Sequence, residues 1–152
     1  MHILITGTST GIGAGLAKYY LKEGHHVYGI SRKSNPQLQN EKFSFLSLDL
    51  SNFSDVSTRL SSYLKEIPVL GLAILNAGIL NEIKDLKDTS LEEIRRTMNI
   101  NVWANKMLID ILFAHGQKIK QIVAISSGAS VSGARGWNAY ALSKATLNML
   151  IQ

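Results

Sequence analysis

After Met1 the chain reads His2-Ile3-Leu4-Ile5-Thr6-Gly7-Thr8-Ser9-Thr10-Gly11-Ile12-Gly13-Ala14-Gly15. The apolar run that ends at Thr6 has the length and composition of a buried strand. Residues 16–23, beyond the glycines, have helical periodicity and stop at Gly24. Glycines between a strand and a helix let the backbone approach a diphosphate, and the helix N-terminus offers N–H groups and a favourable dipole. A tight turn also needs glycine for conformational reasons alone, so other residues must support nucleotide binding.

The alternation of strand and helix continues along the chain. We expect strands at 26–31, 43–48, 71–75 and 121–127, a polar loop at 85–90, and helices at 52–67, 91–115 and from residue 137 onward. Ser90 and Glu93 form a candidate capping box for the long helix, and Gly116 is its predicted stop. This order favours an α/β fold with a Rossmann-type doubly wound parallel sheet, forming a single domain over residues 1–152. The carboxyl ends of the strands would meet at the edge where ligands bind in such sheets.

Composition excludes several kinds of chemistry. The sequence has 152 residues, 45% of them hydrophobic, which is enough for a continuous core. It has no cysteine, so disulfides, thiolate metal ligands and cysteine nucleophiles are excluded, and no metal site is predicted. The net charge of +5 would suit an anionic partner, but the basic residues are scattered, so we expect no nucleic-acid partner. We find neither a signal-peptide pattern nor a membrane-spanning run, and therefore expect a cytoplasmic protein that does not bind membranes.

Polar residues and glycines follow the other predicted strands: Ser31 and Arg32, then Asp49 and Leu50, then Asn76-Ala77-Gly78. In a nucleotide-binding unit, a carboxylate after the second strand bonds the ribose 2′-hydroxyl, whereas a basic residue there accepts a 2′-phosphate. Arg32 stands there without a carboxylate, and its planar fork of donors favours NADP over NAD. The alternative is that Arg32 and Lys33 are solvated loop cations. Asp49 either binds the adenine edge or is simply the polar end of a strand.

Near the end of the sequence stands Ala139-Tyr140-Ala141-Leu142-Ser143-Lys144. On a helix, Tyr140 and Lys144 would share a face, because they are four residues apart. A cation beside a phenol favours the phenolate, which brings a tyrosine closer to the range useful for general acid/base catalysis. Such a pair is also a common surface contact. Two further residues favour chemistry here: Asn101, a weak helix former inside a predicted helix, and Ser127, at the end of a predicted strand.

Assembled, these residues resemble the short-chain dehydrogenase/reductase family. The segment from Thr6 to Gly13 fits its TGxxxGxG pattern rather than the TGxxGxxG of the extended branch, and Asn76-Ala77-Gly78 fits its NAG. Tyr140 and Lys144 fit YxxxK, and Ser127 precedes Tyr140 by the family's usual thirteen residues (140 − 127). Asn101 falls at the family's mid-helix asparagine. The resemblance implies an oxidoreductase that transfers a hydride between NADP, with NAD as the alternative, and a small-molecule carbonyl or secondary alcohol.

The resemblance also assigns roles. Tyr140 would be the general acid/base, Lys144 would favour its ionised form and hold the nicotinamide ribose, Ser127 would bind the substrate oxygen, and Asn101 would hold a water that links Lys144 to solvent. The cofactor-binding residues would be Gly7, Ser9, Thr10, Gly11, Ile12, Gly13, Ser31, Arg32, Asp49, Leu50, Asn76, Ala77 and Gly78, together with Tyr140 and Lys144. The complete form is expected to be a homo-oligomer, a dimer or tetramer, formed through the two long helices.

Two departures from the family pattern bear on these expectations. Family members continue beyond this last helix through further strands and a substrate loop. The sequence is therefore expected to be either a fragment or a short form lacking the C-terminal strands, with little turnover by the 152 residues alone. Thr8-Ser9-Thr10 lacks the basic residue found there in many NADP-preferring members, which weakens the argument for NADP. A non-catalytic nucleotide-binding or interaction protein on the same scaffold is the alternative, since fold does not dictate function.

Overall fold

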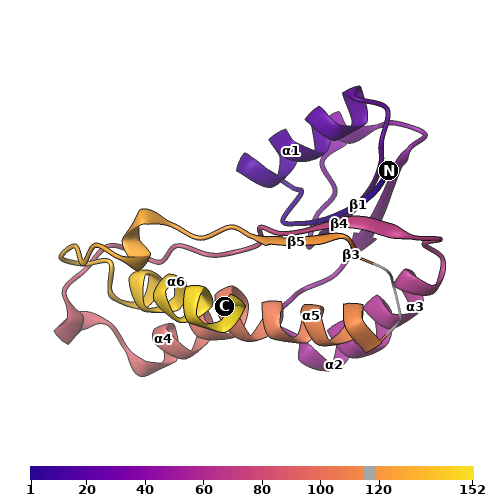
Figure 1. Ribbon diagram of the computed structural model, residues 1–152. Coiled ribbons are helices and arrows are strands. Elements are labelled where there is room, and N and C mark those ends of the chain that lie inside the picture. The colour runs from indigo at the N-terminus through magenta and orange to yellow at the C-terminus, as the bar shows by residue number, and fades with distance from the viewer. Residues whose placement is uncertain (115–118) are drawn as a thin grey trace.

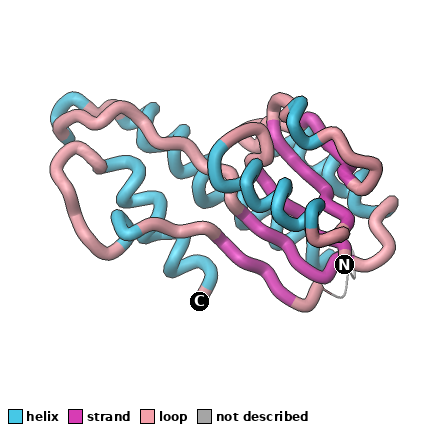
Figure 2. The backbone as a smooth tube through the Cα atoms, turned by 90° about the horizontal axis from the view of Figure 1, so that it is seen from above, coloured by secondary structure: helices cyan, strands magenta, loops and turns pink. Residues whose placement is uncertain are grey.

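A computed structural model describes residues 1–114 and 119–152, and its sheet is parallel throughout (Figures 1 and 2). The strands of the described residues are β1 (His2–Thr6), β2 (His26–Ser31), β3 (Phe43–Ser47), β4 (Leu70–Leu75) and β5 (Gln121–Ala124). They lie in the order β3-β2-β1-β4-β5, which confirms the predicted Rossmann-type α/β fold. The chain moves outward from β1 to β3 and returns to pair β4 on the other side of β1. That reversal creates the crevice in which such folds bind ligands.

Helices cover both faces of the sheet. They are α1 (Gly11–Lys22), α2 (Phe53–Asp55), α3 (Ser61–Lys65), α4 (Leu91–Met98), α5 (Ala104–Ala114) and α6 (Asn138–Ile151). Figure 1 shows α1 on one face and the other helices on the opposite face. Ile3 and Ile5 pack in the core beneath α1, whereas Leu4 packs in the core of the other face, because successive strand residues point to opposite sides. Both faces are apolar because both are covered.

Several predicted helix signals are confirmed. The Ser90 side chain accepts the Glu93 N–H at 3.2 Å, and a Glu93 carboxylate oxygen accepts the Ser90 N–H at 3.0 Å, which is the capping box that begins α4. Asn52 caps α2 by accepting the Asp55 N–H at 3.2 Å. Gly24 follows α1 with a φ of 80°, a conformation that suits glycine. None of the helices in the described ranges is both long and apolar enough to cross a membrane.

Other boundaries differ from the prediction. Helix α1 begins at Gly11 rather than after the glycines, and β5 ends at Ala124 rather than at residue 127. The predicted helices at 52–67 and 91–115 are each interrupted by a π-helical turn, Val56–Leu60 in the first and Asn99–Trp103 in the second. Hydrophobic periodicity does not reveal a single inserted residue, so these turns could not be predicted from it. The predicted end at His115 and Gly116 lies outside the described residues.

A pair of histidines lies at the edge of the sheet where β1 and β2 begin, opposite the crevice at the carboxyl ends of the strands. His2 and His26 are register partners, and their rings stack at a centroid distance of 4.9 Å. The Nδ1 atom of His2 lies 2.9 Å from the Tyr28 hydroxyl. Burial, and then the charges of His26 and the N-terminal ammonium, lower the pKa of His2 below its ordinary value of 6.5. Protonation of His2 is therefore less favourable in the folded protein than in the unfolded chain.

This difference predicts a loss of stability in acid. Stability from unprotonated His2 is complete above pH 6.5 and is lost as the pH falls through the lowered folded pKa, because the unfolded chain then binds the extra proton. We expect the free energy of unfolding, measured by urea denaturation, to fall between about pH 7.5 and about pH 5. His2→Gln should reduce this fall, whereas His25→Gln, outside the stacked pair, should not. An unchanged pH dependence in His2→Gln would contradict the assignment.

Candidate active site

The turn between β1 and α1 is shaped to receive an anion. Gly7 and Gly11 have φ angles of 78° and 61°, in the left-handed region that favours glycine. Thr10 is the N-cap residue of α1 in an extended conformation, and its side chain makes no capping hydrogen bond. The first turn of this twelve-residue helix therefore has main-chain N–H groups that no N-cap side chain satisfies. A phosphate group fits such a helix N-terminus.

A cavity of about 350 Å³ opens beside this turn, at the carboxyl ends of β1 to β4. Its volume is within the range of small-molecule sites, about 300–1,000 Å³. Eleven residues predicted to bind the cofactor line it: Gly7, Ser9, Thr10, Ile12, Ser31, Arg32, Asp49, Leu50, Asn76, Ala77 and Gly78. The lining also includes four apolar residues that sequence analysis missed: Ile30, Leu48, Ile79 and Ile100. They lie at or beside strand ends or in a π-turn, so only the tertiary structure places them here.

Four other residues predicted to bind the cofactor do not line this cavity: Gly11, Gly13, Tyr140 and Lys144. A Cβ atom on Gly13 would lie 2.3 Å from the Gly7 carbonyl oxygen and 2.5 Å from Asn76 Nδ2. Gly13 therefore allows α1 to pack directly against the end of β1. Gly11 is exposed, and its positive φ turns the chain into the helix. Gly13 therefore determines how closely α1 packs, and Gly11 determines the turn that leads into it.

A buried threonine joins the two strands at the crevice. Thr6 Oγ1 accepts the N–H groups of Asn76 at 3.0 Å and Ala77 at 2.9 Å, and Asn76 Nδ2 donates to the Thr6 carbonyl oxygen at 2.9 Å. Thr6 has no solvent exposure. These bonds hold the end of β1 against the start of the loop after β4. In the sequence Thr6 is only the first residue of the TGxxxGxG motif, and nothing nearby indicates these hydrogen bonds.

The loops after β2 and β3 form the far side of the cavity. Ser31 is buried and donates to the Lys33 carbonyl oxygen at 2.8 Å, which shapes the turn that presents exposed Arg32. Asp49 Oδ1 accepts the Ser51 N–H at 2.9 Å and the Ser51 hydroxyl at 2.8 Å. These hydrogen bonds, the backbone one above all, lower the pKa of Asp49 below 3.8. Asp49 is therefore an ionised acceptor at neutral pH.

Lys144 is a buried cation beside Tyr140. The residue is 4% exposed, and its Nζ donates to the Ile125 carbonyl oxygen at 2.6 Å. The same Nζ lies 5.7 Å from the centroid of the Tyr140 ring, so the two side chains share one face of α6 as predicted. Burial lowers the pKa of Lys144 below its ordinary value of 10.5. A burial of this kind is costly for an ammonium, and the carbonyl contact offsets part of the cost.

Asn101 connects three segments around this lysine. Its Oδ1 accepts the Ile79 N–H at 2.8 Å, and its Nδ2 donates to the Ile79 carbonyl oxygen at 3.0 Å and to Ser143 Oγ at 2.9 Å. A Cβ atom on Gly78 would lie 3.3 Å from Asn101 Oδ1 and 3.7 Å from Lys144 Nζ. The loop after β4, the π-turn and α6 therefore meet here. The side chain of this mid-helix asparagine thus bonds outside its own helix, to the loop after β4 and to α6.

Ser127 lies in a loop that is tied to α6. It is the N-cap of a short 3₁₀ helix, Gly128–Ser130, and its Oγ accepts the Ala129 N–H at 3.2 Å. On either side, Ser126 Oγ donates to Asn148 Oδ1 at 2.6 Å and Asn148 Nδ2 donates to Ser130 Oγ at 2.8 Å. Asn148, which sequence analysis did not single out, thus holds the Ser127 loop against the helix that carries Tyr140.

Comparison with known proteins agrees with this geometry. The family model for short chain dehydrogenase matches residues 1–152. A Bacillus subtilis protein named benzil reductase ((S)-benzoin forming) is 32% identical over 96% of this chain. The solved structure of ElxO with NADP bound superposes with a TM-score of 0.88 at 28% identity, over 98% of this chain and 64% of that one. A 4-hydroxyisoleucine dehydrogenase complexed with NADH and succinate gives 0.85 at 28% identity, over 97% of this chain and 69% of that one.

The chain therefore belongs to the short-chain dehydrogenase family. Fold, glycine turn and the Tyr140–Lys144 pair all agree with that membership. The chain spans 63% of the length of the Bacillus subtilis relative.

The packing of Gly13 gives a matched test. In Gly13→Ala the new methyl group would meet main-chain atoms that cannot swing away, and we expect the free energy of unfolding to fall by about 1–3 kcal/mol. Gly15→Ala, two residues further along α1, meets nothing within 4 Å and should be neutral or stabilising by about 0.5–1 kcal/mol. Urea denaturation measures both changes. Equal stability of the two variants would contradict the packing role.

Proposed function

We propose that the protein is an NAD(P)-dependent oxidoreductase that interconverts a carbonyl compound and an alcohol, with Tyr140 as general acid/base. The observation that carries this proposal is the buried ammonium of Lys144, 5.7 Å from the Tyr140 ring and beside Gly78 of the cavity wall. A lysine is rarely buried without a function to serve or an acidic partner. Here its hydrogen-bond acceptor is the neutral carbonyl of Ile125, and its neighbour is a phenol that can ionise.

The residues around the cavity suit a dinucleotide. Gly7, Ser9 and Thr10, with the N-terminus of α1, would hold the diphosphate. Asp49 and Leu50 would contact the adenine, and Arg32 would pair with a 2′-phosphate, which favours NADP over NAD. When bound, the nicotinamide supplies a hydride to the carbonyl carbon or accepts one from the alcohol carbon.

Tyr140 would complete the reaction by moving a proton. In reduction its phenol donates to the carbonyl oxygen, so that hydride and proton together give the alcohol; in oxidation the phenolate takes that proton back. The ammonium of Lys144 would favour the phenolate, which is the form left by reduction and the form that begins oxidation. Ser127 would donate a hydrogen bond to the substrate oxygen, and Asn101 would hold the water through which the proton is replaced from solvent.

The name of a relative suggests a substrate to test. The name of the Bacillus subtilis relative makes benzil the first carbonyl compound to test.

We also propose that the complete protein is a homo-oligomer, a dimer or tetramer. Phe113 at the end of α5 and Met149 on α6 are 66% and 70% exposed, which agrees with burial of these helices between subunits in the complete protein.

Replacement of the phenol tests the catalytic proposal. We expect Tyr140→Phe to reduce kcat for benzil with NADPH by about 10²–10⁴-fold, because the variant has no proton to donate. Binding of NADPH, followed by its fluorescence, should be retained. Tyr19→Phe on α1, whose side chain is exposed, is the matched control and should be fully active. Cofactor binding without Tyr140-dependent turnover would instead support a non-catalytic nucleotide-binding protein.

A charge deletion tests the cofactor proposal. Loss of a charge-assisted contact of about 1.5–3 kcal/mol predicts that Arg32→Ala raises the Kd for NADPH by about 10–100-fold. The Kd for NADH should change little, because NADH has no 2′-phosphate. Arg59→Ala removes the same charge from an exposed residue that does not line the cavity, and should leave both constants unchanged. An initial preference for NADH that survives in Arg32→Ala would refute the 2′-phosphate role.

A further inference from the structure

Two loops beyond the candidate active site are joined by an ion pair. One follows β4 and includes the short 3₁₀ helix Leu86–Asp88; the other follows β5 and leads into α6. Arg135 donates from Nε to Asp85 Oδ1 and from its Nη2 to Asp85 Oδ2, both at 2.6 Å. This bidentate contact lowers the pKa of Asp85 below 3.8. An exposed pair adds little to stability, so its importance lies in where it holds the two loops.

Three more contacts join the same loops. Lys84 N–H donates to the Gly136 carbonyl oxygen at 3.3 Å, and Asn138 Nδ2 donates to the Lys84 carbonyl oxygen at 3.0 Å. Gly136 has a φ of 85°, and a Cβ atom there would lie 2.6 Å from Ile83 Cγ2. We call these contacts, with the Asp85–Arg135 pair, the loop clasp. Only glycine allows the backbones to come this close.

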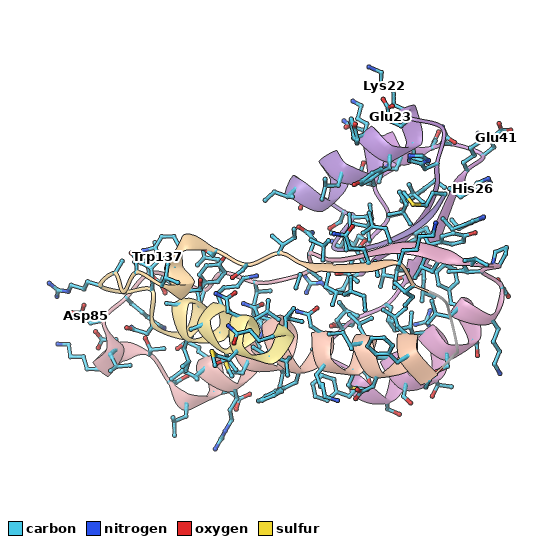
Figure 3. All side chains as sticks on the ribbon, in the orientation of Figure 1. Lys22, Glu23, His26, Glu41, Asp85 and Trp137 are labelled. Atoms are coloured by element: carbon cyan, nitrogen blue, oxygen red, sulfur yellow. The ribbon has the colours of Figure 1, made fainter. Side chains whose placement is uncertain are left out.

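Trp137 lies within the clasp, between Gly136 and Asn138, and touches Tyr140. Its N–H donates to the Ala134 carbonyl oxygen at 3.2 Å, and its own carbonyl oxygen accepts the Ala141 N–H at 2.7 Å. The backbone is thus held from both sides. The indole lies edge-on to the Tyr140 ring, with centroids 5.8 Å apart and planes at 61°. Figure 3 shows Trp137 and Asp85 at the same end of the molecule, opposite His26.

The Trp137 indole leaves apolar surface open to solvent. Trp137 belongs to neither of the two cores formed by the described residues, and its side chain is half-buried. A large aromatic ring left partly open to solvent beside a proton-donating phenol is placed to contact whatever binds that phenol. Ile83, 55% exposed and also within the clasp, adds apolar surface nearby.

We propose that Trp137 is a specificity-determining residue that packs against an aromatic substituent of the carbonyl substrate while Tyr140 acts on the carbonyl oxygen. This inference rests on the proposed function. Because Trp137 and Tyr140 are three residues apart at the start of α6, their side chains lie on the same side of the helix. A carbonyl bonded to the phenol therefore has its substituent within reach of the indole. Rings in such contact gain affinity beyond the burial of surface, and an aliphatic substituent gains less.

The test compares kcat/KM for benzil with that for butane-2,3-dione, using NADPH. We expect Trp137→Ala to lower the ratio of benzil to butane-2,3-dione about tenfold or more, while turnover of the small diketone changes little. Trp137→Phe should retain most of the preference because it keeps an aromatic ring. Trp103→Ala, which removes an exposed tryptophan from a different segment, should leave the ratio unchanged. An equal loss for both diketones in Trp137→Ala, or no loss, would overturn the inference.

A binding measurement separates failure of this inference from failure of the proposed function. The chain has two tryptophans, so Trp137 is the only one in Trp103→Phe. Saturable quenching of the Trp137 fluorescence by benzil, but not by butane-2,3-dione, supports the aromatic site even if no carbonyl compound is turned over. A lack of turnover would defeat the proposed function alone. Absence of quenching in this variant would defeat the inference, whatever Tyr140→Phe shows.

Discussion

The site depends on the hydrogen bonds between Thr6 and the loop after β4. One buried hydroxyl oxygen accepts both the Asn76 and the Ala77 N–H, and Asn76 returns a bond to the Thr6 carbonyl oxygen. These bonds join β1 to β4 where the order of strands reverses, so that the glycine turn and the Asn76 loop form two sides of one cavity. Gly13 can then pack α1 against the same point, because it has no side chain to separate them.

A second network extends from this cavity to the phenol. Asn101 bonds Ile79 on one side and Ser143 on the other, while Ser143 Oγ donates to the Tyr140 carbonyl oxygen at 2.7 Å. Lys144 lies beside Asn101 and Gly78, buried, with its ammonium on the Ile125 carbonyl oxygen. Each buried polar group in this chain of contacts has a partner, and buried polar networks of that kind rigidify the residues they connect. Helix α6, which carries Tyr140 and Lys144, is thereby fixed to the wall of the cavity.

Much of this arrangement was predictable, and the parts that were not have a common cause. The strands, the capping box at Ser90 and the Tyr140–Lys144 pair follow from local patterns, because periodicity and capping depend on neighbours in sequence. The π-turn at Asn99–Trp103 did not follow, since hydrophobic periodicity does not reveal a single inserted residue, and the partner of its Asn101 side chain, Ile79, is 22 residues away. Thr6 and Asn148 were missed for the same reason: their partners are 70 and 22 residues away. The lining residues Ile79 and Ile100 look like ordinary core residues in the sequence.

The sequence by itself determined the class of fold, the family and the pairing of Tyr140 with Lys144 on one helix face, because each depends on short spacings that the chain carries with it. Only the tertiary structure decided which glycines line the cavity and which pack behind it, since the packing of a missing Cβ atom depends on a distant backbone. It alone also brought the loop after β4 against the loop after β5. Such contacts between segments about fifty residues apart exist only once the parallel strands have aligned their ends.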